Sequence, residues 1–65
     1  MDKAYIIQEQ DKMIPTIESF AQLHKAKGIT FGHDGKFVIT FTLEDMDVTI
    51  EGDSSQDIIR QLLEW

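Results

Sequence analysis

Residues 28–52 read GITFGHDGKFVITFTLEDMDVTIEG, and this stretch decides the fold of the 65-residue chain. Its middle part, residues 36–43, alternates large apolar side chains with smaller ones. Because successive side chains of a strand point to opposite faces, this pattern predicts a strand with one buried and one exposed face. The buried face would carry Phe37, Ile39, Phe41 and Leu43, and the exposed face Val38, Thr40 and Thr42.

Two further runs with the same alternation flank this strand. Residues 46–51 alternate three apolar residues with Asp, Thr and Glu, and residues 29–31 place two apolar residues around a threonine. Residues 32–35 contain an Asp-Gly pair, which readily adopts the positive φ angles of a tight hairpin. Residues 44–45 are polar enough for a second short turn. The stretch therefore predicts a three-stranded antiparallel meander.

Residues 2–27 carry a helical pattern, because their apolar positions recur at spacings of three and four. Asp2 suits the N-cap position, and Gly28 falls where the helix is expected to stop. The predicted apolar stripe consists of Ile6, Ile7, Met13, Ile14, Ile17, Phe20, Ala21 and His24.

Pro15 interrupts this helical pattern. A proline inside a helix removes a hydrogen bond and clashes with the preceding turn, so a kink or break is expected near Met13 or Ile14. In the alternative, Asp11 caps a helix that has Pro15 in its first turn, and residues 4–8 form an added edge strand. We favour two helical segments, because the apolar stripe stays in phase across the proline.

The C-terminal residues predict a second helix. Ser54 and Asp57 have the spacing of a capping box, and an amphipathic helix of about three turns follows. Its apolar face would consist of Ile58, Ile59, Leu62 and Leu63, with Trp65 one turn beyond Leu62. The predicted fold class is α+β, a small two-layer α-β-β-β-α domain with both helices on one face of the sheet.

Size and composition limit the classes of protein to consider. A chain of 65 residues makes one domain, residues 1–65, whose stability is marginal without further support. It has no cysteine, so neither disulfides nor thiolate metal sites are available. Its apolar runs are shorter than a membrane span, and its first residues do not resemble a signal peptide. We expect a cytoplasmic protein, for which homodimerisation would add stability.

The negative charge is unevenly distributed. The net charge is −6, and residues 33–65 hold all of it, with eight acidic and two basic residues. No Lys or Arg occurs between Leu43 and Ile59. If the meander is correct, the acidic residues of this region gather on the second turn, on the outer face of the third strand and at the start of the last helix. They are Glu44, Asp45, Asp47, Glu51, Asp53 and Asp57.

Two interpretations of these six acidic residues compete. Acidic residues commonly solubilise a surface, and Asp53 and Asp57 suit a helix N-terminus. Alternatively, the cluster binds a basic partner and imitates the phosphates that a nucleic-acid-binding protein recognises. A cation site is a weaker hypothesis, because the spacing does not match the twelve-residue calcium loop. We expect no metal and no cofactor. Direct nucleic-acid binding is disfavoured, because the six basic residues form no stripe.

The remaining reactive side chains predict no enzyme. His24 lies on or beside the helical stripe, and His33 belongs to a predicted turn, without a third ligand or a nucleophile placed beside either. Ser54 and Ser55 are expected to be capping residues.

The leading hypothesis is therefore a non-enzymatic acidic protein that engages a basic surface of a protein partner. Its compact acidic format is similar in kind to small inhibitors encoded by phages and mobile elements, such as uracil-DNA glycosylase inhibitors and anti-CRISPR proteins. This is a likeness of format and transfers no site. The alternative hypothesis is a structural or regulatory module that acts through apolar contacts as a homodimer, using the first helix or the sheet edge.

Overall fold

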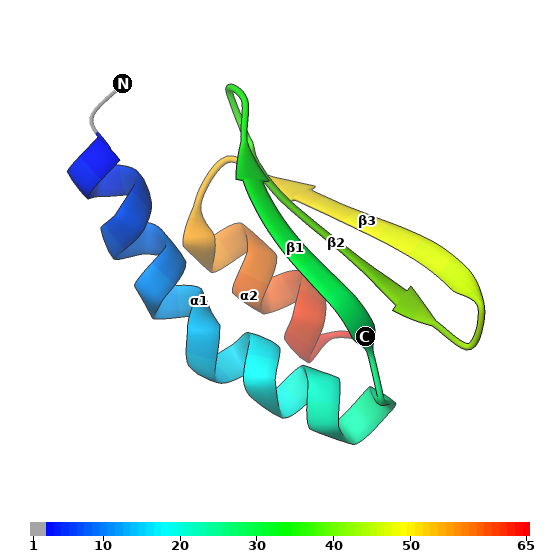
Figure 1. Ribbon diagram of the computed structural model, residues 1–65. Helices are drawn as coiled ribbons and strands as arrows, with labels where there is room; N and C mark the ends of the chain where they lie inside the picture. The colour runs from blue at the N-terminus through cyan, green and yellow to red at the C-terminus, as the bar shows by residue number, and fades with distance from the viewer. Residues whose placement is uncertain (1–2) are drawn as a thin grey trace.

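The computed structural model describes residues 3–65 and has the predicted α-β-β-β-α order (Figure 1). The three strands form one antiparallel sheet in the order β1-β2-β3, and both helices cover the same face of it. The predicted meander and layer arrangement are thus confirmed. The predicted N-cap at Asp2 lies outside the described residues. The elements are α1 (Lys3–His24), β1 (Lys27–His33), β2 (Phe37–Leu43), β3 (Met46–Gly52) and α2 (Ser55–Leu63).

The central strand β2 supplies most of the sheet's buried face, as its alternation predicts. Phe37, Ile39 and Phe41 are buried, and Ile39 pairs with Ile50 of β3. The helices complete the core with Met13 and Phe20 from α1 and Ile58 and Leu62 from α2. Among residues 3–65, no helix covers the opposite face (Figure 1). It carries Thr30, Val38, Thr40, Thr42, Asp47, Thr49 and Glu51.

The two hairpin turns differ in length. Leu43 pairs with Met46, so Glu44 and Asp45 alone connect β2 to β3, and both have positive φ angles of 48° and 69°. Positive φ at both central positions is the geometry of a type I′ turn, whose twist matches that of the flanking strands. The first hairpin corrects our prediction, because β1 continues through His33 and the loop comprises residues 34–36.

Helix α1 runs unbroken across Pro15, so the predicted break and the alternative edge strand are both wrong. A change of direction near the middle of α1 agrees with the predicted kink (Figure 1). Residues 4–8 are helical rather than an edge strand, and there are no two separate helical segments. Pro15 lies on the exposed side of the helix, where water can bond the Asp11 carbonyl that the proline leaves without a donor. Met13 and Phe20 are buried on either side of the proline, so both halves of the helix pack against the core.

The C-terminus of α1 also differs from the prediction, which placed the stop at Gly28. The helix ends at His24, and Lys25 adopts a left-handed conformation with φ of 57°. The Ala26 N–H then donates to the Ala21 carbonyl at 3.2 Å, which closes the helix with a Schellman-type bond. Gly28 lies instead within β1, at an irregularity in the pairing with β2.

Helix α2 begins as its sequence predicts. The Asp57 N–H donates to the Ser54 side chain at 3.3 Å, and the Asp57 carboxylate accepts from the Asp53 N–H at 3.2 Å. Gly52 permits this close approach, because a Cβ at this position would lie 2.7 Å from the Asp57 Cβ. Trp65 follows the helix and packs edge-on against Phe20 and Phe41, with ring centroids 5.5 Å and 5.8 Å away.

One polar contact joins the two helices inside the core region. Glu9 of α1 is only 8% exposed, and its carboxylate accepts a hydrogen bond from the Ser55 hydroxyl at 2.9 Å. The other carboxylate oxygen lies 2.8 Å from the Lys12 ammonium. The hydrogen bond from Lys12, followed by that from Ser55, lowers the pKa of Glu9 below its ordinary value. A carboxylate on α1 thus fixes the first turn of α2.

Candidate binding surface

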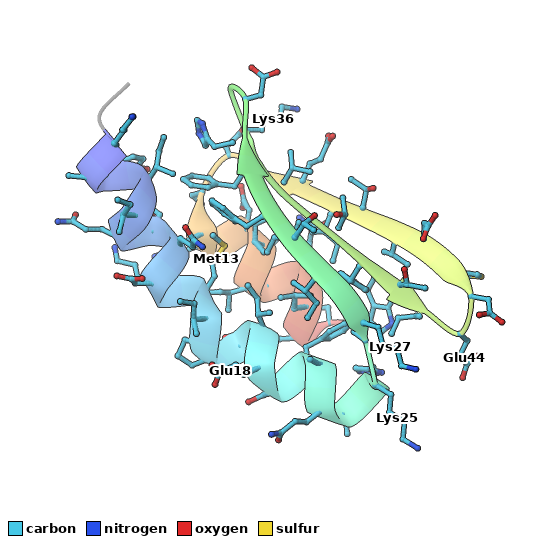
Figure 2. The ribbon with its side chains drawn as sticks, viewed as in Figure 1. Met13, Glu18, Lys25, Lys27, Lys36 and Glu44 are labelled. Carbon is cyan, nitrogen blue, oxygen red and sulfur yellow. The ribbon has the colours of Figure 1, made fainter. Side chains whose placement is uncertain are left out.

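The six acidic residues singled out by the sequence lie along β3 and at both of its ends. This strand is an edge of the sheet. Seven residues of extended chain span about 20 Å, so the acidic residues form an elongated band rather than one tight cluster. Figure 2 shows Glu44 at one end of the sheet and Lys36 at the other.

The end of the band at the β2–β3 turn is the more uniformly acidic. Glu44, Asp45 and Asp47 are all exposed, and none of them forms an ion pair within 4.0 Å in the part of the chain that the structure describes. Asp47 accepts a hydrogen bond from the Thr42 hydroxyl at 3.1 Å, which orients its carboxylate on the outer face of the sheet. Lys25 and Lys27 lie at the same end of the sheet (Figure 2).

The other end of the band contains two basic residues, of which only Lys36 is distant in the sequence from the acidic residues beside it. Lys36, from the β1–β2 loop, lines the same shallow hollow as Glu51 and Asp53. Arg60, one turn along α2, lies 3.6 Å from the Asp57 carboxylate. The Asp57 carboxylate also accepts a hydrogen bond from the Asp53 N–H at the start of α2, so its interactions lie within that helix terminus. We define the acidic face as the five remaining residues, Glu44, Asp45, Asp47, Glu51 and Asp53.

A threonine-rich sheet face adjoins the acidic residues. The Thr30 and Thr40 hydroxyls are hydrogen-bonded to each other across β1 and β2. Thr42, already bonded to Asp47, and exposed Thr49 continue this polar surface toward β3. Because cross-strand hydrogen bonds restrict these side chains, the carboxylates of Asp47 and Glu51 project from an ordered sheet and not from a mobile loop.

Both histidines pack against aromatic rings of the core. The His24 ring packs against Phe20 with centroids 4.5 Å apart, and the His33 ring packs edge-on against Phe37 at 4.6 Å. Within residues 3–65, no three His, Cys, Asp or Glu side chains converge as metal ligands would. Both histidines are thus accounted for by packing beside the core.

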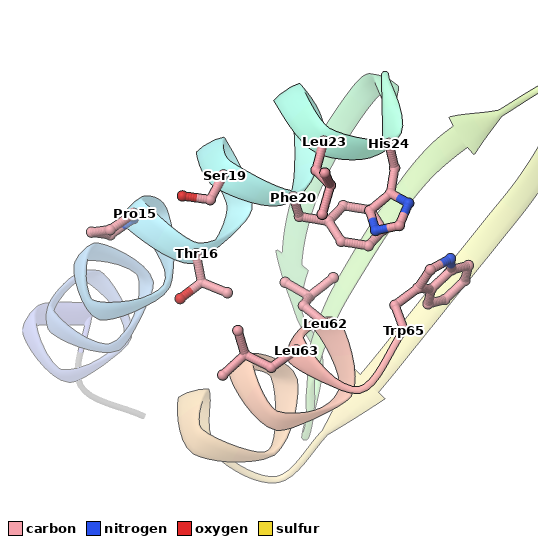
Figure 3. Close-up of a pocket in the computed structure, with 9 residues that line it drawn as sticks. All are labelled: Pro15, Thr16, Ser19, Phe20, Leu23, His24, Leu62, Leu63 and Trp65. Carbon is pink, nitrogen blue, oxygen red and sulfur yellow. The ribbon is translucent and has the colours of Figure 1, made fainter.

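A second surface, which the sequence reasoning missed, lies between the two helices. Leu23 of α1 and Leu63 of α2 are 78% and 74% exposed, and they stand beside a hollow of about 320 Å³ (Figure 3). The sequence assigned Leu63 to the apolar core face and left Leu23 outside the stripe. We call this surface the helix groove. It is lined by Pro15, Thr16, Ser19, Phe20, Leu23, His24, Leu62, Leu63 and Trp65.

Comparison with known proteins yields no relative for this chain: no family model, curated protein or solved structure matches it. Among residues 3–65, neither helix combines the length and the apolar character needed to cross a bilayer.

Proposed function

We propose that this protein is a non-enzymatic binding protein whose acidic face engages a basic surface of a protein partner. One observation carries the proposal. Five exposed carboxylates lie along and beside one edge strand, and none of them is neutralised by an ion pair within residues 3–65. Exposed carboxylates that outnumber the basic side chains around them produce a local negative field, which attracts a partner of opposite charge and accelerates association.

The geometry favours a partner that normally binds nucleic acid. Asp47 and Glu51 lie four residues apart on β3, about 13 Å along the strand axis. Glu44 and Asp45 precede the strand and Asp53 follows it, so the carboxylates are spaced along the length of β3. A nucleic-acid strand likewise presents negative charges at regular intervals, and proteins that bind it read them with Lys and Arg. The acidic face would occupy such a basic groove and inhibit the partner.

The turn residues give this proposal further support. Glu44 and Asp45 both have positive φ, where an Asn-Gly pair would be more favourable. The sequence thus keeps two carboxylates at the tip of the hairpin at some cost to the stability of the turn. A role in binding accounts for that cost.

The test is affinity capture of a partner from lysate of the source cell, followed by affinity measurements with the purified pair. The test variant combines Glu44→Gln, Asp45→Asn, Asp47→Asn and Glu51→Gln. A matched control neutralises four exposed acidic residues elsewhere, with the same two Asp and two Glu. Each variant changes the net charge from −6 to −2, because four charges are removed. The control changes are Asp11→Asn, Glu18→Gln, Asp34→Asn and Glu64→Gln.

We expect the wild-type complex to weaken about tenfold or more between about 50 mM and about 200 mM salt, and nucleic acid to displace the protein from its partner. The test variant should lose most of the affinity, and the control should retain it. Equal affinity of the test variant and the wild type would refute the proposal. A similar loss of affinity in both variants would show that binding depends on the net charge of the protein and not on the acidic face.

A further inference from the structure

We infer that the helix groove is the contact surface of a homodimer, in which the helix layer of a second copy covers that of the first. This interface lies on the helix layer, whereas Asp47 and Glu51 of the acidic face project from the opposite face of the sheet. The inference is therefore independent of the proposed acidic function.

The shape of the groove suits a copy of itself. Leu62 and Leu63 of α2 face Phe20 and Leu23 of α1 across the hollow (Figure 3). Two highly exposed leucines thus stand beside an apolar depression on the same surface. A two-fold axis brings the same patch of both subunits together, so the leucines of each copy can fill the depression of the other. Trp65, which is 51% exposed at the edge of the groove, supplies an aromatic anchor.

The charge distribution favours a dimer that forms through the helix groove over one that forms through the acidic surfaces. Two chains of net charge −6 repel one another, and the repulsion is strongest where carboxylates would face carboxylates. The nine residues that line the groove include no Asp, Glu, Lys or Arg side chain. Two copies can therefore meet at these nine residues without burying like charges, and Asp47 and Glu51 would point away from the contact. Glu44 lines a neighbouring hollow with His24 and Trp65, so it is the acidic residue that would lie nearest to the contact.

The surface area also favours an additional contact. The chain exposes 4632 Å², whereas a monomeric protein of 7.5 kDa exposes about 4,200 Å². A standard interface covers about 800 Å² per partner, which is about a sixth of this surface. The core has eight buried apolar side chains and no disulfide among the described residues, so a small domain of this kind gains stability from a dimer contact.

The primary experiment measures the molar mass of the full chain by sedimentation over a range of concentrations. We expect a reversible monomer–dimer equilibrium whose dimer has twice the 7.5 kDa mass of the chain and persists at high salt, because salt screens the repulsion between the two copies. Trp65 is the only tryptophan, so its emission should shift to shorter wavelength as the dimer forms and water leaves the groove.

Two variants and one control locate the interface. Leu23→Lys and Leu63→Lys place a charge in the groove and should each raise the dimer dissociation constant about tenfold or more. Ile7→Lys is the control, because Ile7 is also an exposed apolar residue of α1, at 56%. At 3.6 residues per turn, Ile7 points about 160° away from Leu23 around the helix. Ile7→Lys should leave the dissociation constant unchanged. Circular dichroism checks that each variant is folded.

Three outcomes would overturn the inference. The first is a wild-type protein that remains monomeric at all concentrations. The second is a dimer that both groove variants leave intact, and the third is a dimer that Ile7→Lys disrupts, which would place the contact on the other flank of α1. The wild-type measurement needs no substitution, so it is decisive even if a groove variant fails to fold. A monomer whose Trp65 emission shifts on adding an amphipathic peptide would instead assign the groove to a partner helix.

Discussion

Glu9 shows at the scale of a single residue why the first helix was harder to predict than the strands. The sequence stripe includes Ile7 and Ile14, yet both are exposed, whereas Glu9 is buried. A charged residue at that position carries no sign of burial in the linear sequence. Its burial depends on Ser55, which lies 46 residues further along the chain. Periodicity gives the side of a helix that faces inward, but it does not identify distant polar partners.

This buried carboxylate predicts a specific dependence of stability on pH. The folded-state pKa of Glu9 is lowered, first by the Lys12 hydrogen bond and then by that of Ser55. A group whose pKa is lower in the folded than in the unfolded state stabilises the fold above its unfolded pKa, which is about 4.3 for Glu. That contribution is lost as the pH falls through the folded-state pKa. Acidification below about pH 4 should therefore lower the urea midpoint of unfolding.

Glu9→Gln tests this assignment against Glu18→Gln, an exposed glutamate of the same helix. The Glu9 variant should have a lower urea midpoint than the wild type at pH 7, and this difference should shrink on acidification. The Glu18 variant should follow the wild-type curve. If Glu9→Gln keeps the full acid sensitivity of the wild type, the pH dependence arises from other carboxylates.

At the scale of the elements, strands were easier to predict than helix boundaries. The alternation in β2 and β3 is local, because each side chain's face follows from its position alone. The effect of Pro15 is not local. Whether a helix bends, breaks or continues there depends on the packing of Met13 and Phe20 against the sheet and α2, which the pattern of one segment does not contain.

Because α1 continues across Pro15, replacing this residue should stabilise the protein. Pro15→Ala restores a donor for the Asp11 carbonyl and removes the clash with the preceding turn. A proline costs about 3 kcal/mol relative to alanine inside a helix, and its restriction of the unfolded chain offsets up to about 1 kcal/mol. We expect a gain of about 2 kcal/mol in the free energy of unfolding, measured by urea denaturation.

Gln22→Ala is the control for the proline substitution, since it changes an exposed position of the same helix. It should alter the free energy of unfolding by a few tenths of a kcal/mol at most. A Pro15→Ala protein no more stable than this control would indicate that the proline ring, which lines the helix groove, makes compensating contacts.

At the scale of the whole molecule, the sequence predicted where the six acidic residues gather, but it did not predict all of the basic residues that lie near them. Lys36 approaches one end of the acidic band only because the β1–β2 loop lies beside the end of β3 and the start of α2. The helix groove was likewise missed, because its walls come from residues about 40 positions apart, such as Leu23 and Leu63. Surfaces assembled by packing need the relative placement of elements, which the local patterns do not specify.

The acidic face also bears on aggregation, because β3 is an edge strand with unpaired backbone groups. Charged side chains on such an edge discourage pairing with the edge of another molecule. This role competes with the proposed role in binding. The two make different predictions for one protein, the variant with Glu44, Asp45, Asp47 and Glu51 neutralised.

If binding is the reason for these carboxylates, that variant should be more stable than the wild type at low salt. Removing mutual repulsion among exposed charges contributes roughly 0.2–1 kcal/mol, or about 1–8 °C in Tm for a domain of this size. The Asp47→Asn side chain keeps an oxygen that can accept from Thr42, so the sheet contact is retained. The gain should diminish as salt screens the repulsion. Thermal melts at low and high salt, with light scattering, provide the measurement.

A variant that stays monodisperse, melts at a higher temperature and no longer binds a basic partner would mean that the carboxylates are present for binding and lower the stability of the fold. A variant that aggregates while its Tm is unchanged would assign them to protection of the β3 edge.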